Sequence, residues 1–158
     1  MHNEHIQYMR EAVMLAIKNL NKKNGGPFGA IVVKDGKVIA RGVNSVTTDH
    51  DPTAHAEINA IRTACRKLKS HQLEGCDVYS SCEPCPMCLS ALYWARPRKV
   101  YFGASRKDAE NAGFDDAKIY EEMEKHHFFR ELPNEQINIP EAAEVFVKWK
   151  NSEHKIEY

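Results

Sequence analysis

Three of the chain's five cysteines are crowded into the stretch SSCEPCPMC, near its middle. Cys82, Cys85 and Cys88 follow one another at intervals of three residues. Thiols at this spacing could form a disulfide, ligate an iron–sulfur cluster or bind zinc. The rest of the sequence has to distinguish these three kinds of chemistry.

The disulfide and the iron–sulfur cluster fit this sequence poorly. The stretch MHNEHIQYMREA is polar and charged, unlike a secretion signal, so we expect a cytoplasmic protein with reduced thiols. A ferredoxin-type run needs a further cysteine where this chain has Leu92, and no cysteine follows Cys88. Zinc remains, either in a structural site with Cys82 as fourth ligand or in a catalytic site with three protein ligands.

The stretch HAE favours the catalytic kind of site. His55, Cys85 and Cys88 would supply three zinc ligands and leave the fourth position to water. Glu57 could lie beside that water, take its proton as hydroxide attacks, and return the proton to a leaving amine. His-x-Glu followed by Pro-Cys-x-x-Cys is the signature of zinc deaminases acting on nucleobases. A non-catalytic binding module stabilised by zinc is the alternative, and there Glu57 would have no role.

Apolar periodicity predicts the helices that position these residues. Ile6, Met9, Val13, Ile17 and Leu20 recur at spacings of three and four, which is typical of an amphipathic helix. Two further helices begin at the motifs themselves, so their amino ends favour thiolate over thiol. We expect these and the remaining helices over AHAEINAIRTACRKL, PMCLSALYWA, residues 116–125 and PEAAEVFVKWK.

The strands follow from short β-rich runs between those helices. AIVV and VIARGV flank KDGK, so they predict a hairpin that turns at Asp35 and Gly36. CDVYSS and KVYFGA predict two later strands, and INI in the tail is a candidate for a fifth. Alternation of strands and helices after a hairpin indicates an α/β sandwich whose later strands run parallel.

Composition limits the class of partner. The 158 residues carry 22 basic and 22 acidic side chains, so the formal net charge is zero and a nucleic-acid partner is not expected. No apolar run approaches the ~18–20 residues of a membrane span, so no membrane partner is expected. Without linker or repeat, residues 1–158 are interpreted as a single domain.

Over nearly its whole length the chain resembles the cytidine deaminase superfamily, and within it the bacterial zinc-dependent guanine deaminases. The resemblance rests on GGPFGAIVVKDG, NSVTT, DPTAHAEINAIR, SCEPCPMCLSALYWARP, AGFDDAKIY and the terminal EY. It implies a three-layer α/β/α sandwich with a mixed central sheet of about five strands, and one zinc ion per subunit. The implied reaction converts guanine and water to xanthine and ammonia, with Glu57 as proton shuttle.

The resemblance also implies roles for further residues. Asn44 would donate or accept hydrogen bonds with the substrate, Phe28 would stack on the base, and Asp116 would assist the substrate amine, unless Asp115 has that role. Further contacts with the substrate are implied for Ala56, Trp94 and Tyr158. A homodimer is implied as well, with a C-terminal segment of about residues 140–158 swapped to the partner subunit.

Other substrates remain open, namely tRNA adenosine, cytosine-type bases and aminotriazines. The core motifs are shared with tRNA adenosine deaminases, whereas YWARP, GFDD and the terminal tyrosine are more particular to the guanine branch. The chain departs from the family pattern at Ser90, where glycine is common, and over EKHHFFRELPNEQ.

Overall fold

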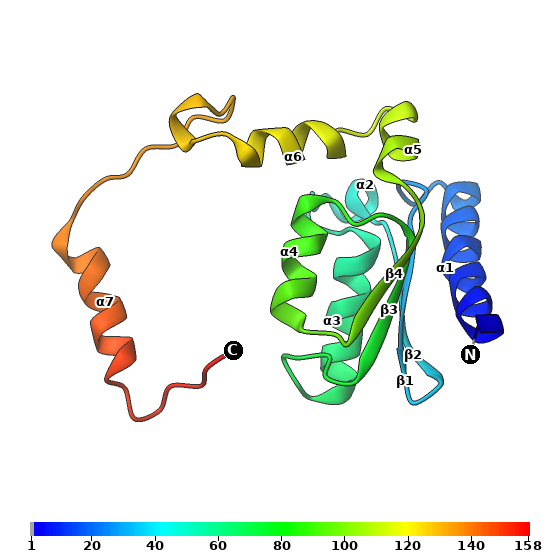
Figure 1. The fold of residues 1–158 in the computed structure, drawn as a ribbon, viewed down its shortest axis with the longest axis horizontal. Helices are drawn as coiled ribbons and strands as arrows, with labels where there is room; N and C mark the ends of the chain where they lie inside the picture. Colours follow the sequence, from blue (N-terminus) through cyan, green and yellow to red (C-terminus); the bar gives the residue numbers. More distant parts are fainter. Residues whose placement is uncertain (1) are drawn as a thin grey trace. The chain divides into compact units, whose positions relative to one another are not determined.

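The structure is a computed structural model that describes residues 2–158. Contacts between residues divide the chain into two compact units, the first ending at Tyr120 and the second spanning Glu121–Tyr158. Each unit is described by itself, and Figure 1 gives the order of their helices and strands.

A four-stranded mixed sheet forms the centre of the first unit. Its order is β2-β1-β3-β4, with β1 antiparallel to both neighbours and β3 parallel to β4. The turn between the first two strands has positive φ angles of 49° at Asp35 and 71° at Gly36, as the predicted hairpin requires. The strands are β1 Gly29–Lys34, β2 Lys37–Val43, β3 Cys76–Cys82 and β4 Lys99–Ala104.

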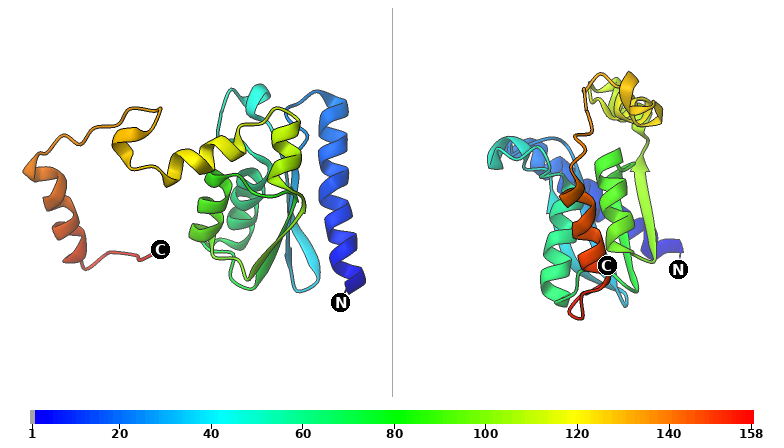
Figure 2. Two further views of the ribbon diagram at one scale, coloured as in Figure 1. Left: turned by 45° about the horizontal axis from the view of Figure 1, so that its top comes forward. Right: turned by 90° about the vertical axis from the view of Figure 1, so that its left-hand side faces the viewer.

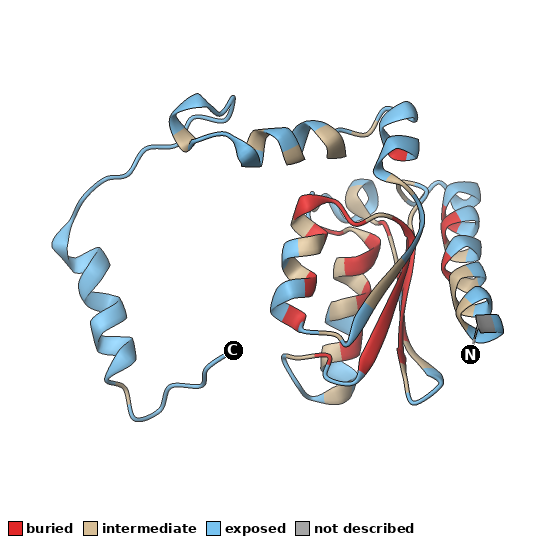
Figure 3. Cartoon of the chain, in the orientation of Figure 1, coloured by how far each residue is buried: buried red, intermediate tan, exposed pale blue. Residues whose placement is uncertain are grey.

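Helices cover both faces of this sheet, which confirms the three-layer fold. The helix α1 (His2–Lys22) lies on one face, and α3 (Ala56–Leu68) and α4 (Pro86–Ala95) lie on the other (Figures 1 and 2). Every residue of β3 is buried, because this strand lies between two others and beneath both helical layers (Figure 3). All three helices begin or end close to their predicted positions.

Alternation along β1 divides the core between the two layers. Ala30 and Val32 are buried in the cluster that includes α3 and α4, whereas Ile31 and Val33 are buried in the cluster that includes α1. On the neighbouring strand, a Cβ at Gly42 would lie 2.1 Å from the carbonyl oxygen of Ala56. Glycine therefore lets the first turn of α3 pack directly on the sheet, close to the motif that this turn carries.

Three smaller helices complete the first unit and its junction with the second. They are α2 (Val46–Asp49), α5 (Arg106–Asn111) and α6 (Asp116–Glu124), of which only the last was predicted. The six-residue α5 begins with a capping box, in which Ser105 and Asp108 bond to each other's backbone N–H groups. A helix of this length is too short to show a helical period of apolar residues, so the sequence pattern did not predict it.

The second unit contains the 3₁₀ helix η1 (His127–Phe129) and the predicted tail helix, α7 (Pro140–Lys150). The fifth strand considered at INI is wrong, since Ile137, Asn138 and Ile139 form no strand. This run has three residues, ends at a proline and pairs with no strand among residues 2–158. The sheet has four strands where about five were expected. Among the described residues, no helix is long and apolar enough to cross a membrane.

Candidate metal centre and active site

The two motifs meet at one edge of the sheet. Because β2 and β3 both run antiparallel to β1, they point the same way, and their carboxyl ends meet there. His55 is the N-cap residue of α3, which follows β2, and Cys85 is the N-cap residue of α4, which follows β3. Open α/β sheets commonly bind ligands outside the carboxyl ends of their strands.

His55, Cys85 and Cys88 form a three-ligand group that fits zinc. Their ligand atoms all lie within 4.8 Å of one another, and Nδ1 of His55 is 3.5 Å from the sulfur of each cysteine. Zinc bonds of about 2.3 Å to sulfur and about 2.0 Å to nitrogen, at tetrahedral angles, require a sulfur–nitrogen separation of ~3.5 Å. The described residues contain no other cluster of this kind.

Cys82, the third thiol of the motif, lies outside this group. Its sulfur is 3.5 Å from the carbonyl oxygen of Ser105. Burial raises the pKa of its thiol to about 11, so this thiol stays protonated at neutral pH. The sequence-based preference for two zinc-binding thiols rather than three agrees with this placement.

The charge state of the group favours a cation. A hydrogen bond from the thiol of Cys88, and a second one with His55, lower the pKa of Cys85 to about 4. The contact between Cys85 and His55 raises the pKa of His55, and the hydrogen bond that Cys88 donates to Cys85 raises the pKa of Cys88. A lowered pKa of Cys85 favours its thiolate form, which is the form that binds a divalent cation of the zinc type.

Glu57 lies beside the ligand group, in the first turn of α3. Its Oε1 accepts a hydrogen bond of 2.9 Å from the hydroxyl of Ser80, and its Oε2 lies 3.4 Å from the sulfur of Cys88. The residue is 6% exposed, and this burial raises the pKa of its carboxyl group. A buried carboxylate with a raised pKa, held beside a metal site, is suited to move protons.

A cavity of about 270 Å³ opens in front of these groups. It is mainly apolar, and its size is near the lower end of the range for small-molecule sites. Six residues that the sequence singled out line it, along with five that it did not. The first set is Phe28, Asn44, His55, Glu57, Cys85 and Asp116, and the second is Gly26, Val46, Thr47, Glu83 and Phe114.

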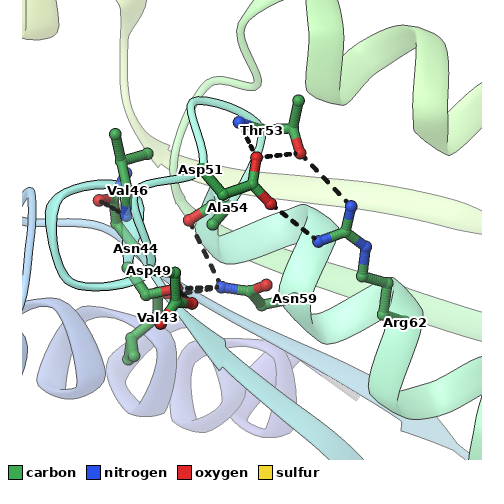
Figure 4. Close-up of polar contacts among 10 residues, drawn as sticks. Val43, Asn44, Val46, Asp49, Asp51, Thr53, Ala54, Asn59 and Arg62 are labelled. Atoms are coloured by element: carbon green, nitrogen blue, oxygen red, sulfur yellow. Dashed lines mark hydrogen bonds and ion pairs between the residues drawn. The ribbon is translucent and has the colours of Figure 1, made fainter.

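A polar network holds the loop between β2 and α3, which contributes Asn44 and His55 (Figure 4). The side-chain amide of Asn59 donates to the carbonyl oxygens of Val43 at 2.9 Å and Ala54 at 3.4 Å, so it joins the two ends of the loop. It also donates to the hydroxyl of Ser45 at 3.0 Å. One residue of α3 thereby fixes the positions of a cavity residue and a metal ligand.

Phe28 and Asp116 also line the cavity. The ring of Phe28 meets that of Phe114 edge to face, with centroids 4.8 Å apart. Asp116 begins α6, and burial raises the pKa of its carboxyl group. One turn later Tyr120 donates a 2.8 Å hydrogen bond to the carbonyl oxygen of Pro84, which ties this helix to the loop before Cys85.

Two predicted substrate contacts in the first unit, Ala56 and Trp94, do not line this cavity. Ala56 is fully buried against the sheet, and Trp94, on α4, is 61% exposed. Tyr158 belongs to the second unit, so its contact with substrate stays a prediction. Conversely, no role was expected for Glu83, which lines the cavity. Its position between two cysteines of the motif could have indicated that it lies at the site. For Phe114, the only indication of a place at the site was its position next to Asp115 in the stretch GFDD.

Comparison with known proteins identifies the relatives of this arrangement. Residues 2–104 match the family model described as the cytidine and deoxycytidylate deaminase zinc-binding region. The chain is 51% identical to the guanine deaminase of Bacillus subtilis over 98% of this chain and 99% of that protein. The X-ray structure of guanine deaminase from Bacillus subtilis matches with a TM-score of 0.95 and covers 98% of each chain.

Two further relatives match a smaller part of the chain. The tRNA-specific adenosine deaminase of Aquifex aeolicus is 45% identical over 64% of this chain and 67% of its own. A structure of guanine deaminase from Nitrosomonas europaea is 36% identical, with a TM-score of 0.66 over 69% of this chain and 63% of that one. The chain therefore belongs to the cytidine and deoxycytidylate deaminase zinc-binding family, and zinc is the metal that His55, Cys85 and Cys88 are placed to hold.

Proposed function

We propose that this protein is a guanine deaminase, which hydrolyses guanine to xanthine and ammonia. In this reaction a carbon–oxygen bond forms with water, the bond between the ring carbon and the exocyclic nitrogen breaks, and the amine leaves as ammonia. The observation that carries the proposal is the 51% identity with the Bacillus subtilis enzyme, which extends over nearly the entire chain and not only over the zinc motifs.

The side chains around the cavity have distinct roles in this proposal. Zinc, when bound, supplies the positive charge that makes a water molecule nucleophilic at neutral pH. Glu57, buried beside Cys88, accepts a proton from the nucleophile and returns it to the leaving amine. Asp116 accepts a hydrogen bond from an N–H group of the base, and Phe28 and Phe114 provide its apolar walls.

The second unit provides the basis for a proposal about assembly. It contains large apolar side chains that are more than half exposed, among them Phe128, Phe129, Phe146 and Ile156. Exposed apolar surface, where it is contiguous, marks sites of protein–protein contact. We propose a homodimer in which the C-terminal segment of one subunit closes the active site of the other, with Tyr158 at the substrate.

We also propose a cytoplasmic location for the protein. All five cysteines are free, which fits a reducing compartment such as the cytoplasm.

The first test is release of ammonia and xanthine from guanine, with zinc measured in the same sample. We expect turnover and about one zinc ion per chain. Adenosine in tRNA, cytosine and an aminotriazine should be poor substrates by comparison. Rapid turnover of a tRNA anticodon loop with none of guanine would place the chain with the adenosine deaminases instead.

A Glu57→Gln variant separates an enzyme from a zinc-stabilised binding module. The amide keeps the shape of the side chain and cannot take up the proton, so kcat should fall by about 10²–10⁴-fold while zinc content is unchanged. In a binding module every property would survive the substitution. Mixing Glu57→Gln with Tyr158→Ala then tests the swap, because only swapped mixed dimers contain one intact site and recover activity.

A further inference from the structure

We infer that Asn19, a buried residue of α1 outside the cavity, is a positioning residue that determines which end of the Asn44 amide faces the substrate. The inference rests on the proposed function, because it assigns to Asn44 the recognition of a hydrogen-bond acceptor on the base. Asn19 is 2% exposed and lies near the carboxyl end of α1, next to the Gly25–Gly26 loop.

The side chain of Asn19 acts as a double donor. Its Nδ2 donates to the carbonyl oxygen of Gly26 at 2.9 Å and to that of Asn44 at 2.8 Å. The opposite orientation of the amide would point an oxygen at two carbonyl oxygens, so only this one is compatible with both partners. The remaining atom, Oδ1, accepts no hydrogen bond from any residue in the described part of the chain.

The side chain of Asn44 is fixed through its oxygen. Its Oδ1 accepts from the backbone N–H groups of Gly26 at 3.0 Å and Val46 at 3.3 Å. A reversed amide would place two donors against two donors, which excludes that orientation. The Nδ2 group makes no hydrogen bond with any residue from 2 to 158, and Asn44 lines the cavity.

The two asparagines therefore form one unit with the glycine loop. Asn19 holds the backbone of Gly26 and Asn44, and Gly26 in turn holds the oxygen of the Asn44 side chain. The fit is close, since a Cβ at Gly25 would lie 2.5 Å from the carbonyl oxygen of Asn44. The Nδ2 group of Asn44 therefore offers the cavity an N–H donor at this position and not an acceptor.

The N–H donor of Asn44 determines which kind of substrate group can bind next to it. A carbonyl oxygen or an unprotonated ring nitrogen can accept the hydrogen bond, and guanine has both. Asp116, which lines the same cavity, accepts hydrogen bonds only, as long as it is ionised. The cavity then presents a donor from Asn44 and an acceptor from Asp116, which orients a base that has the complementary pattern.

The experiment is a double-mutant cycle between Asn19 and Asn44, made in the Glu57→Gln background so that guanine is bound and not consumed. Asn19→Leu keeps the size of the side chain and removes both donors. We expect the Kd for guanine to rise about tenfold, which corresponds to one well-formed hydrogen bond. In a chain that also has Asn44→Ala, the same substitution should change the Kd less than twofold.

Control variants distinguish a general structural role of Asn19 from its positioning of Asn44. Asn21→Leu, at an exposed position on the same helix, should leave the Kd unchanged. If Asn19→Leu fails to retain zinc or a cooperative thermal transition, Asn19→Ser, with a single donor, replaces it and should give an intermediate Kd. An equal rise in Kd with and without Asn44, or no rise at all, overturns the inference. Failure of the wild-type protein to produce xanthine would instead contradict the proposed function.

Discussion

The hydroxyl of Ser80, on β3, donates a 2.9 Å hydrogen bond to Oε1 of Glu57, on α3. Both residues are buried, and the bond joins a strand and a helix through residues that are 23 positions apart in the sequence. The other carboxylate oxygen of Glu57 lies beside Cys88. The sheet thus orients the proposed proton shuttle toward the metal ligands.

Replacing Ser80 by alanine should lower kcat for guanine by about 10–100-fold, because the carboxylate loses its orienting donor. KM should change little, since Ser80 does not line the cavity. Steady-state kinetics on the zinc-loaded variant measure both constants. Ser81→Ala is the matched control: its hydroxyl accepts from the backbone N–H of Gly29 and does not touch Glu57. Equal losses of kcat in the two variants would contradict the role given to Ser80.

Removal of zinc should abolish turnover and lower the thermal stability of the protein. Zinc at 100 times its Kd would contribute about 2.7 kcal/mol to the free energy of unfolding, provided that the unfolded chain does not bind it. Differential scanning calorimetry with and without a chelator measures the shift in Tm, and added zinc should restore both Tm and activity. Activity that survives complete removal of the metal, confirmed by elemental analysis, would refute a zinc-dependent mechanism.

Tyr120→Phe should weaken the attachment of α6 to the loop before Cys85. It removes the hydrogen bond to Pro84 and keeps the ring over which Arg106 lies, 5.0 Å from its centroid. The loss is about 1 kcal/mol, the usual value of one hydrogen bond. We expect kcat/KM for guanine to fall several-fold, because Asp116 on the same helix loses its anchor. Unchanged kinetics with an unchanged Tm would show that this bond does not position Asp116.

Acid should weaken the loop before His55 through Asp51. Hydrogen bonds from Thr53, assisted by Arg62, hold the pKa of Asp51 below its ordinary value of 3.8. A lowered folded-state pKa contributes stability above about pH 4, and this contribution is lost as the pH falls through the folded-state pKa. The stability difference between wild type and Asp51→Asn should therefore shrink below about pH 4. Urea unfolding across this range measures it, and a constant difference would exclude this role for Asp51.

The sequence by itself determined the chemistry and most of the helices. His55, Glu57, Cys85 and Cys88 lie within local motifs at helix starts, and local spacing is sufficient to recognise them. The helices over residues 56–68, 86–95 and 140–150 follow from apolar period and proline punctuation, which are also local properties. The strand considered at INI was wrong because strand formation needs a hydrogen-bonding partner, which no local pattern reveals.

Only the tertiary structure decided what surrounds those motifs. Ser80 reaches Glu57, and Asn19 reaches Asn44, across 23 and 25 residues of sequence, and neither serine nor asparagine at those positions has a local signature. Their roles arise because the carboxyl ends of β2 and β3 meet at one edge of the sheet, beside the end of α1. The sequence therefore determined which groups can react, and the packing of distant segments determined how those groups are oriented.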